Sequence, residues 1–197
     1  MFVAITPPPT AVEDLDEFLT PRRDTWPGRW TAPDQWHLTL AFMPGVADRH
    51  LDDLEARLER VATRRTPFEV ALTGGGCFPD PAQAKVLFAR LTGSGDQLGP
   101  LATATRAAAT KAGAAPEGGP FTPHVTLART RRPLEATRWL RVLDTYRGPV
   151  WPVRELVLVA SHLGEGPRRR PRHEVLSRWP LGERSGAASV HLDETRG

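Results

Sequence analysis

Apolar residues along this chain recur with two different periods. Short runs that are alternating or continuously apolar predict strands, whereas apolar residues three and four positions apart predict helices. Strands are expected at 2–6, 37–42, 68–72, 85–91, 124–129, 153–161 and 173–179. Helices are expected at 10–19, 49–64, 96–112 and 133–143. The chain is therefore expected to combine helices and strands throughout its length.

Local signals indicate where several of these helices begin and end. Thr10 and Glu13 form the T-x-x-E pattern of a capping box, which predicts a helix start at this point. Gly113 follows the third predicted helix and is expected to cap its C-terminus. Pro133 is expected to open the fourth helix, because proline is favoured at the first helical position. The glycine-rich segment 73–83 is expected to connect two strands.

The predicted elements occur twice in the same order: helix, strand with a His-x-Thr motif, helix, strand, strand. Each element of the second series lies about 86 residues after its counterpart, and a period of that length indicates duplication of a domain-sized unit. We therefore expect residues 1–181 to form a single bilobal domain, with duplicated units at about 10–92 and 96–181. Residues 182–197 lack periodicity and are expected to form a flexible C-terminal tail.

Composition limits the classes to which the chain can belong. Its 197 residues are 40% hydrophobic and 25% charged, which is ordinary for a soluble globular protein. No apolar run is long enough to span a membrane, and the N-terminus does not resemble a signal peptide. The sequence has one cysteine, Cys77, so an intramolecular disulfide is excluded and a reducing cytoplasm is the expected location.

Positive charge gathers in one segment near the C-terminal end. The formal net charge of the chain is only +3, but four arginines lie between Arg168 and Arg172 in a segment rich in glycine and proline. This run is either a solvated loop or a contact for a polyanionic partner such as an RNA backbone.

Two nearly identical motifs carry the candidate chemistry. His37 and Thr39 are separated by a leucine, and His124 and Thr126 by a valine, each pair within a predicted strand. Because side chains alternate on a strand, each histidine shares one face with its threonine while the apolar residues face the other way. If the two strands are central, both histidines and both threonines meet in one groove.

This set of residues suits acid–base chemistry at a phosphodiester. One imidazole can accept a proton while the other donates one, and threonine hydroxyls can donate hydrogen bonds to phosphate oxygens. Other interpretations stay open: surface histidines, threonines selected for their β-branching, and a zinc site. No HxH, HExxH or CxxC pattern is present, which argues against zinc.

At these motifs the sequence resembles the 2H phosphoesterase superfamily, and within it the bacterial and archaeal RNA 2′,3′-cyclic phosphodiesterases once described as 2′–5′ RNA ligases. The resemblance covers roughly residues 1–181 and includes "RWTAPDQWHLTLAFMPGV", "FTPHVTLAR" and "HEVLSRWPL". It implies an α+β fold of two pseudo-symmetric lobes of antiparallel sheet, with outer helices around a central groove. It also implies His37 and His124 as the catalytic residues, with Thr39 and Thr126 as substrate-binding residues.

The resemblance suggests two further substrate contacts. Arg129 falls where family members often place a basic residue near the phosphate, and a strand-end surface charge is the alternative. Phe42 either stacks a base in the groove, as aromatic residues do with single-stranded RNA, or packs in the core. Where relatives commonly read "RFLG", this chain reads "AFMPG", so Ala41 replaces a basic residue.

The implied activity is hydrolysis of RNA 2′,3′-cyclic phosphate ends to the 2′-phosphate, without a metal or other cofactor. We expect His124 to act as the base and His37 as the acid, although the pseudo-symmetry makes the two look alike. The alternatives are an RNA end-binding module without turnover, and an enzyme for another cyclic phosphate or a 2′–5′ linkage. The expected partner is RNA or a nucleotide with a cyclic phosphate, with no membrane contact and a monomeric state.

Overall fold

A computed structural model describes residues 1–93, 95–162, 164–166 and 171–182 of the chain. Its helices are α1 (Pro9–Leu19), α2 (Leu51–Thr63), α3 (Leu98–Lys111) and α4 (Thr137–Leu143). Its strands are β1 (Phe2–Ile5), β2 (Arg29–Trp30), β3 (Leu38–Phe42), β4 (Phe68–Phe78), β5 (Ala84–Gly93), β6 (His124–Leu134), β7 (Arg147–Val153), β8 (Glu155–His162) and β9 (Arg172–Pro180). Most of the predicted arginine run and nearly all of the predicted tail lie outside the described residues.

The described strands form one antiparallel sheet in the order β7-β4-β5-β6-β3-β1-β8-β9, and β2 also pairs with β6. The central strands β3 and β6 are paired at a single register position, Leu38 opposite Val125. This short contact brings the two His-x-Thr motifs side by side in the middle of the sheet. The expected α+β fold with antiparallel sheet is confirmed.

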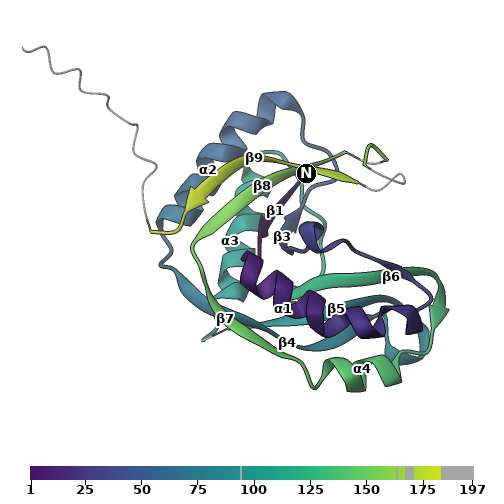
Figure 1. Cartoon of the computed structure of the whole chain (residues 1–197). Helices are drawn as coiled ribbons and strands as arrows, with labels where there is room; N and C mark the ends of the chain where they lie inside the picture. Colours follow the sequence, from purple (N-terminus) through teal and green to yellow (C-terminus); the bar gives the residue numbers. More distant parts are fainter. Residues whose placement is uncertain (94, 163, 167–170, 183–197) are drawn as a thin grey trace, which may run out of the picture.

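The sheet has two lobes that meet at this central pair (Figure 1). The His37 lobe consists of β3, β1, β8 and β9, and the His124 lobe consists of β6, β5, β4 and β7. Helix α2 packs against β9 and α3 against β3, while α1 packs against β7 and α4 against β4. Each lobe takes strands from both expected units, because β4 and β5 join the His124 lobe and β8 and β9 join the His37 lobe. The lobes are therefore not the two sequence units, and the duplication itself stays a prediction.

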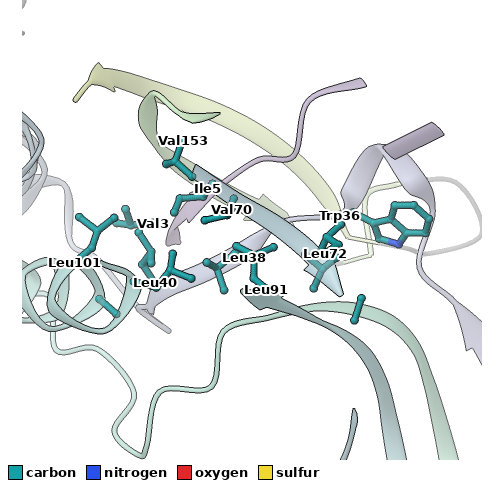
Figure 2. Close-up of a cluster of buried hydrophobic side chains, with 14 of the residues drawn as sticks. Val3, Ile5, Trp36, Leu38, Leu40, Val70, Leu72, Leu91, Leu101 and Val153 are labelled. Atoms are coloured by element: carbon teal, nitrogen blue, oxygen red, sulfur yellow. The ribbon is translucent and has the colours of Figure 1, made fainter. Parts of the chain in front are cut away.

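The central strands alternate between the core and the opposite face. Leu38 and Leu40 are almost fully buried, whereas Thr39 between them is partly exposed, and β6 shows the same alternation around Thr126. Burial of each leucine contributes about 1.5–3 kcal/mol, so this face fixes the register of β3. Figure 2 shows both leucines among buried side chains from either lobe: Val3, Ile5, Val70, Leu72, Leu91, Leu101 and Val153.

Two predicted start signals were wrong. Helix α1 covers the expected segment but begins at Pro9, so Thr10 does not cap it, and the carbonyl of Pro8 accepts hydrogen bonds from the N–H groups of Ala11 and Val12 instead. Pro133 lies near the end of β6, beside a shift in the β5–β6 register, and α4 begins later at Thr137. The C-cap prediction is confirmed, since Gly113 has φ +79° and its N–H donates to the carbonyl of Thr110.

The glycine run after residue 73 was also predicted incorrectly, since β4 continues through it to Phe78. Glycine is weak in strands because it has no side chain to pack. Here neighbouring side chains fill the space that is left: a Cβ at Gly75 would lie 2.5 Å from Leu143, and one at Gly76 would lie 2.3 Å from the ring of Phe88. Strand β7 was not predicted as a separate element.

Candidate active site

Both motif histidines are held by the same local hydrogen bond. The Nδ1 atom of His37 lies 2.7 Å from the carbonyl oxygen of Gln35, and Nδ1 of His124 lies 2.7 Å from the carbonyl oxygen of Thr122. A carbonyl can only accept, so Nδ1 carries the proton in each ring. In the neutral ring the lone pair is then on Nε2, which makes Nε2 the atom able to accept a proton from substrate or water.

The two motifs line one cavity of about 910 Å³. His37, Thr39, His124 and Thr126 all contribute to its wall, so the fold brings the four predicted residues together. Cavities of this size hold small-molecule ligands, and this one has room for more than a phosphate group.

Arginine side chains make the cavity strongly cationic. Arg129 lines it as expected, and Arg129 lies opposite Arg29 in the pairing between β6 and β2. Arg131 and Arg132 follow on β6 and also line the cavity. Among the described lining residues there is no carboxylate. A concave site with one sign of charge attracts ligands of the other sign, here an anion.

Burial changes the proton affinity of both imidazoles. It lowers the pKa of His37 to about 4, against the opposing effect of the hydrogen bond to the Gln35 carbonyl. The positive charges of His173, His124 and Arg129 lower it further. Burial also lowers the pKa of the less buried His124, and Arg129 acts in the same direction.

An aromatic ring supports each histidine from a neighbouring strand. Phe2 on β1 is stacked on His37 with ring centroids 4.4 Å apart and an interplanar angle of 16°. Phe88 on β5 lies 4.9 Å from His124 at 52°. Because Gly76 has no side chain, the Phe88 ring can occupy the space above it and still reach His124.

The sequence analysis missed several residues of this site. Phe2 and Phe88 reach the histidines through strand pairing, which no local pattern reports. His173 on β9 lines the cavity and its ring centroid lies 5.4 Å from that of His37. His173 stands in the "HEVLSRWPL" segment that carried part of the resemblance, so a third histidine there was a usable signal.

Phe42 and Arg172 make other contacts, and the rest of the arginine run lies outside the described residues. Phe42, at the end of β3, is 40% exposed and is not among the residues that line the cavity, so it is not a core residue either. Arg172, the described arginine of the run, is paired with Glu165 at 3.1 Å and Glu174 at 3.2 Å.

Two further properties concern the described residues only. They contain no group of three or more His, Cys, Asp or Glu side chains that could hold a metal ion. Their helices include none with the length and hydropathy needed to cross a membrane.

Comparison with known proteins gives consistent results. An RNA 2′,3′-cyclic phosphodiesterase of Thermus thermophilus is 34% identical over 155 residues, covering 76% of this chain and 73% of the relative. A crystal structure of a Thermus thermophilus protein superposes with a TM-score of 0.75 at 30% identity, covering 92% of this chain and 97% of the other. The crystal structure of E. coli LigT complexed with 3′-AMP gives a TM-score of 0.72 at 27% identity, with coverage of 92% and 97%.

These similarities confirm the resemblance that was based on the two His-x-Thr motifs. The predicted enzyme class, a hydrolase of RNA 2′,3′-cyclic phosphates, agrees with the name of the Thermus relative. The model of the 2′-5′ RNA ligase superfamily matches residues 7–165. That match covers most of the chain, and the chain therefore belongs to the 2′-5′ RNA ligase superfamily.

Proposed function

We propose that this protein hydrolyses the 2′,3′-cyclic phosphate at an RNA or nucleotide end to a 2′-phosphomonoester. One observation carries the proposal: two imidazoles with Nε2 free for proton transfer share a cationic cavity with two threonines. A five-membered cyclic phosphate is a compact anion that presents two ester oxygens and two non-bridging oxygens. The names of the relatives give the same substrate class.

The reaction needs two proton transfers and a site for negative charge. The base takes a proton from water, the water oxygen attacks phosphorus, and the bond between phosphorus and O3′ breaks. The acid gives its proton to O3′, which leaves a 3′-hydroxyl and a 2′-phosphate. Thr39, Thr126 and Arg129 line the cavity, and in this proposal they stabilise the non-bridging oxygens as charge builds up. Histidines perform both transfers in this scheme, so it uses neither a metal ion nor another cofactor.

The difference in burial between the histidines favours one assignment of roles. The sequence suggested His124 as base and His37 as acid. His37 is the more deeply buried ring, and a pKa of about 4 keeps it neutral near pH 7. A neutral imidazole is the form a base needs. We therefore assign His37 as the base and His124 as the acid, and binding of the anionic substrate raises the proton affinity of the acid.

The function is tested by turnover and by removal of each histidine. Cyclic-ended oligonucleotides, 2′,3′-cyclic mononucleotides, 3′,5′-cyclic nucleotides and 2′–5′-linked dinucleotides are incubated with the protein, and products are separated by chromatography. We expect hydrolysis of the 2′,3′-cyclic substrates. His37→Ala and His124→Ala should each lower kcat by about 10²–10⁴-fold, and the double variant should lose less than the product because the pair acts as a unit.

His162→Ala is the matched control, because His162 pairs with Glu174 and does not line the cavity. Its kcat should equal that of the parent. Binding of cyclic-ended RNA without turnover would identify an end-binding module instead. Hydrolysis that survives loss of either cavity histidine would show that the motif is only structural.

A further inference from the structure

The phenylalanine that covers His37 is anchored in a small apolar cluster of its own. This cluster is separate from the main core and consists of four buried residues of β1 and β8: Phe2, Ala4, Val157 and Val159. Phe2 lies directly opposite Val159 in the pairing of these two strands, and residues in such positions point to the same face of the sheet. The Phe2 ring is therefore fixed by packing between β1 and β8.

The Phe2 ring covers one face of the His37 imidazole. The two rings are nearly parallel, at an interplanar angle of 16°, and their centroids are 4.4 Å apart. Rings at this separation are in van der Waals contact, so a water molecule does not fit between them. The carbonyl of Gln35 accepts a hydrogen bond from Nδ1 of the same imidazole at 2.7 Å. The stacked face and this hydrogen bond together fix the orientation of the imidazole and leave Nε2 available for proton transfer.

The phenylalanine beside His124 covers less of its imidazole. Phe88 is tilted by 52° with ring centroids 4.9 Å apart, so only part of that imidazole face is in contact. Phe78 contacts the same imidazole edge-on at 5.2 Å, as His173 contacts that of His37 at 5.4 Å. The two sites thus share an edge contact and differ in how completely a phenylalanine covers the face of the imidazole.

We propose that Phe2 is a positioning residue that fixes the plane of the His37 imidazole and excludes water from one of its faces, and that it thereby keeps His37 neutral for its role as base. The inference rests on the proposed function, which assigns that role to His37. Phe2 is not among the residues that line the cavity, so it acts through His37 and not on the substrate. A charged imidazole depends more on surrounding water than a neutral one does, so the loss of water from one face favours the neutral form.

A phenyl ring can also attract a charged imidazole, and this effect opposes the exclusion of water. The attraction between a cation and an aromatic face raises a pKa by about 1 unit, whereas burial lowers the pKa of a fully buried histidine by up to about 3–5 units. For His37, burial is the largest influence and lowers its pKa to about 4. The exclusion of water is therefore the stronger of the two effects.

The other groups that act on His37 belong to elements other than β1. The charged and titratable groups that lower its pKa lie on β6 and β9: His124, Arg129 and His173. The hydrogen bond to the carbonyl of Gln35 raises it. Burial lowers the pKa of His173 as well, and Asp34 opposes that change. A substitution at Phe2 leaves all these groups in place and isolates the contribution of the phenyl ring.

The direct test is an NMR titration of the Cε1–H group of His37 between about pH 3 and about pH 8. We expect Phe2→Ala to raise the pKa of His37 by about 1 unit or more, because water then reaches the uncovered face. Phe2→Leu keeps an apolar side chain in the cluster but has no flat ring, so a smaller rise is expected. The acidic limb of the kcat/KM profile for a 2′,3′-cyclic mononucleotide should move to higher pH by the same amount in each variant.

Two control variants separate this role from packing alone. Phe88→Leu uncovers His124 instead, so it should move the alkaline limb of the profile and leave the acidic limb in place. Val159→Ala removes packing beside Phe2 but keeps the phenyl ring. It should therefore lower the urea midpoint of unfolding and move neither limb.

A pKa of His37 that is unchanged or lower in both Phe2→Ala and Phe2→Leu would overturn the inference. If Phe2→Ala does not fold, Phe2→Leu decides. A higher pKa with an acidic limb that stays in place would show that His37 is not the base, and the inference would fall with that assignment. If the parent protein opens no cyclic phosphate, the proposed function itself fails, and the NMR titration still measures what Phe2 does to His37.

Discussion

At the scale of single residues, the imidazole of each motif histidine has its proton placed by the backbone. The carbonyls two residues before His37 and His124 accept from Nδ1 and leave Nε2 as the reactive atom. The same local geometry occurs twice, so by itself it makes both rings equally able to accept a proton at Nε2. The two rings differ in how deeply they are buried and in their neighbouring charges.

The pH dependence of kcat/KM follows from these environments. In the proposed mechanism the base, His37, must be neutral, so activity should rise as pH increases through the pKa of His37, at about 4. The acid must be protonated, so activity falls as pH increases through the pKa of His124, which burial holds below its ordinary 6.5. We therefore expect a bell-shaped profile with its optimum on the acidic side of 6.5, measured with a 2′,3′-cyclic mononucleotide across this range. A kcat/KM that keeps rising into alkaline solution would contradict the lowered pKa values of both His37 and His124.

At the scale of elements, strand β4 supports the site without lining it. Its glycine run lets side chains from two other elements, Leu143 from α4 and Phe88 from β5, pack directly on the β4 backbone. Phe88 in turn contacts His124. Strand β4 therefore supports His124, the proposed acid, by leaving space for the Phe88 ring at Gly76.

Gly76→Ala tests this support. The new Cβ would lie 2.3 Å from Cζ of Phe88, so this ring, which contacts His124, must shift. Overpacking of this kind costs about 1–3 kcal/mol of unfolding free energy, and misplacement of a catalytic group by about 1 Å can lower kcat up to 100-fold. Urea unfolding and kcat are measured for the same variant. Gly45→Ala, which has open space around its Cβ, is the control and should change neither quantity.

Prediction from sequence succeeded where the signal is local. The alternation of leucine with His37 and Thr39 reports which face of β3 is buried, because the strand period is two residues. Phe2 and His173 reach the same ring only through the β1–β3 and β8–β9 pairings and the sheet order. Those pairings depend on long-range packing, so no local sequence pattern indicates that Phe2 and His173 belong to the site. The glycine run was expected to be a loop because the side chains that fill it belong to other elements.

At the scale of the whole molecule, the two lobes share one core but carry different charge at the cavity. Strand β6 begins at His124 and continues with Arg129, Arg131 and Arg132, which also line the cavity. Arg131 and Arg132 are exposed side chains. An RNA chain bound by its cyclic end has further phosphates beyond the reacting one, and a row of exposed arginines on the outgoing strand is placed to contact them.

The combined variant Arg131→Ala and Arg132→Ala should therefore affect long substrates selectively. We expect KM for a cyclic-ended oligonucleotide to rise while KM for a cyclic mononucleotide stays near the parent value, because only the longer ligand reaches these side chains. The salt dependence of oligonucleotide binding should weaken by about 0.7 in log–log slope for each lost phosphate contact, since fewer counterions are released. Arg60→Ala with Arg64→Ala removes the same charge from a separate groove beside α2 and α3 and serves as the control for net charge. If that pair changes the slope as much as the β6 pair, the effect comes from the overall field of the protein, and β6 has no specific part in binding the RNA backbone.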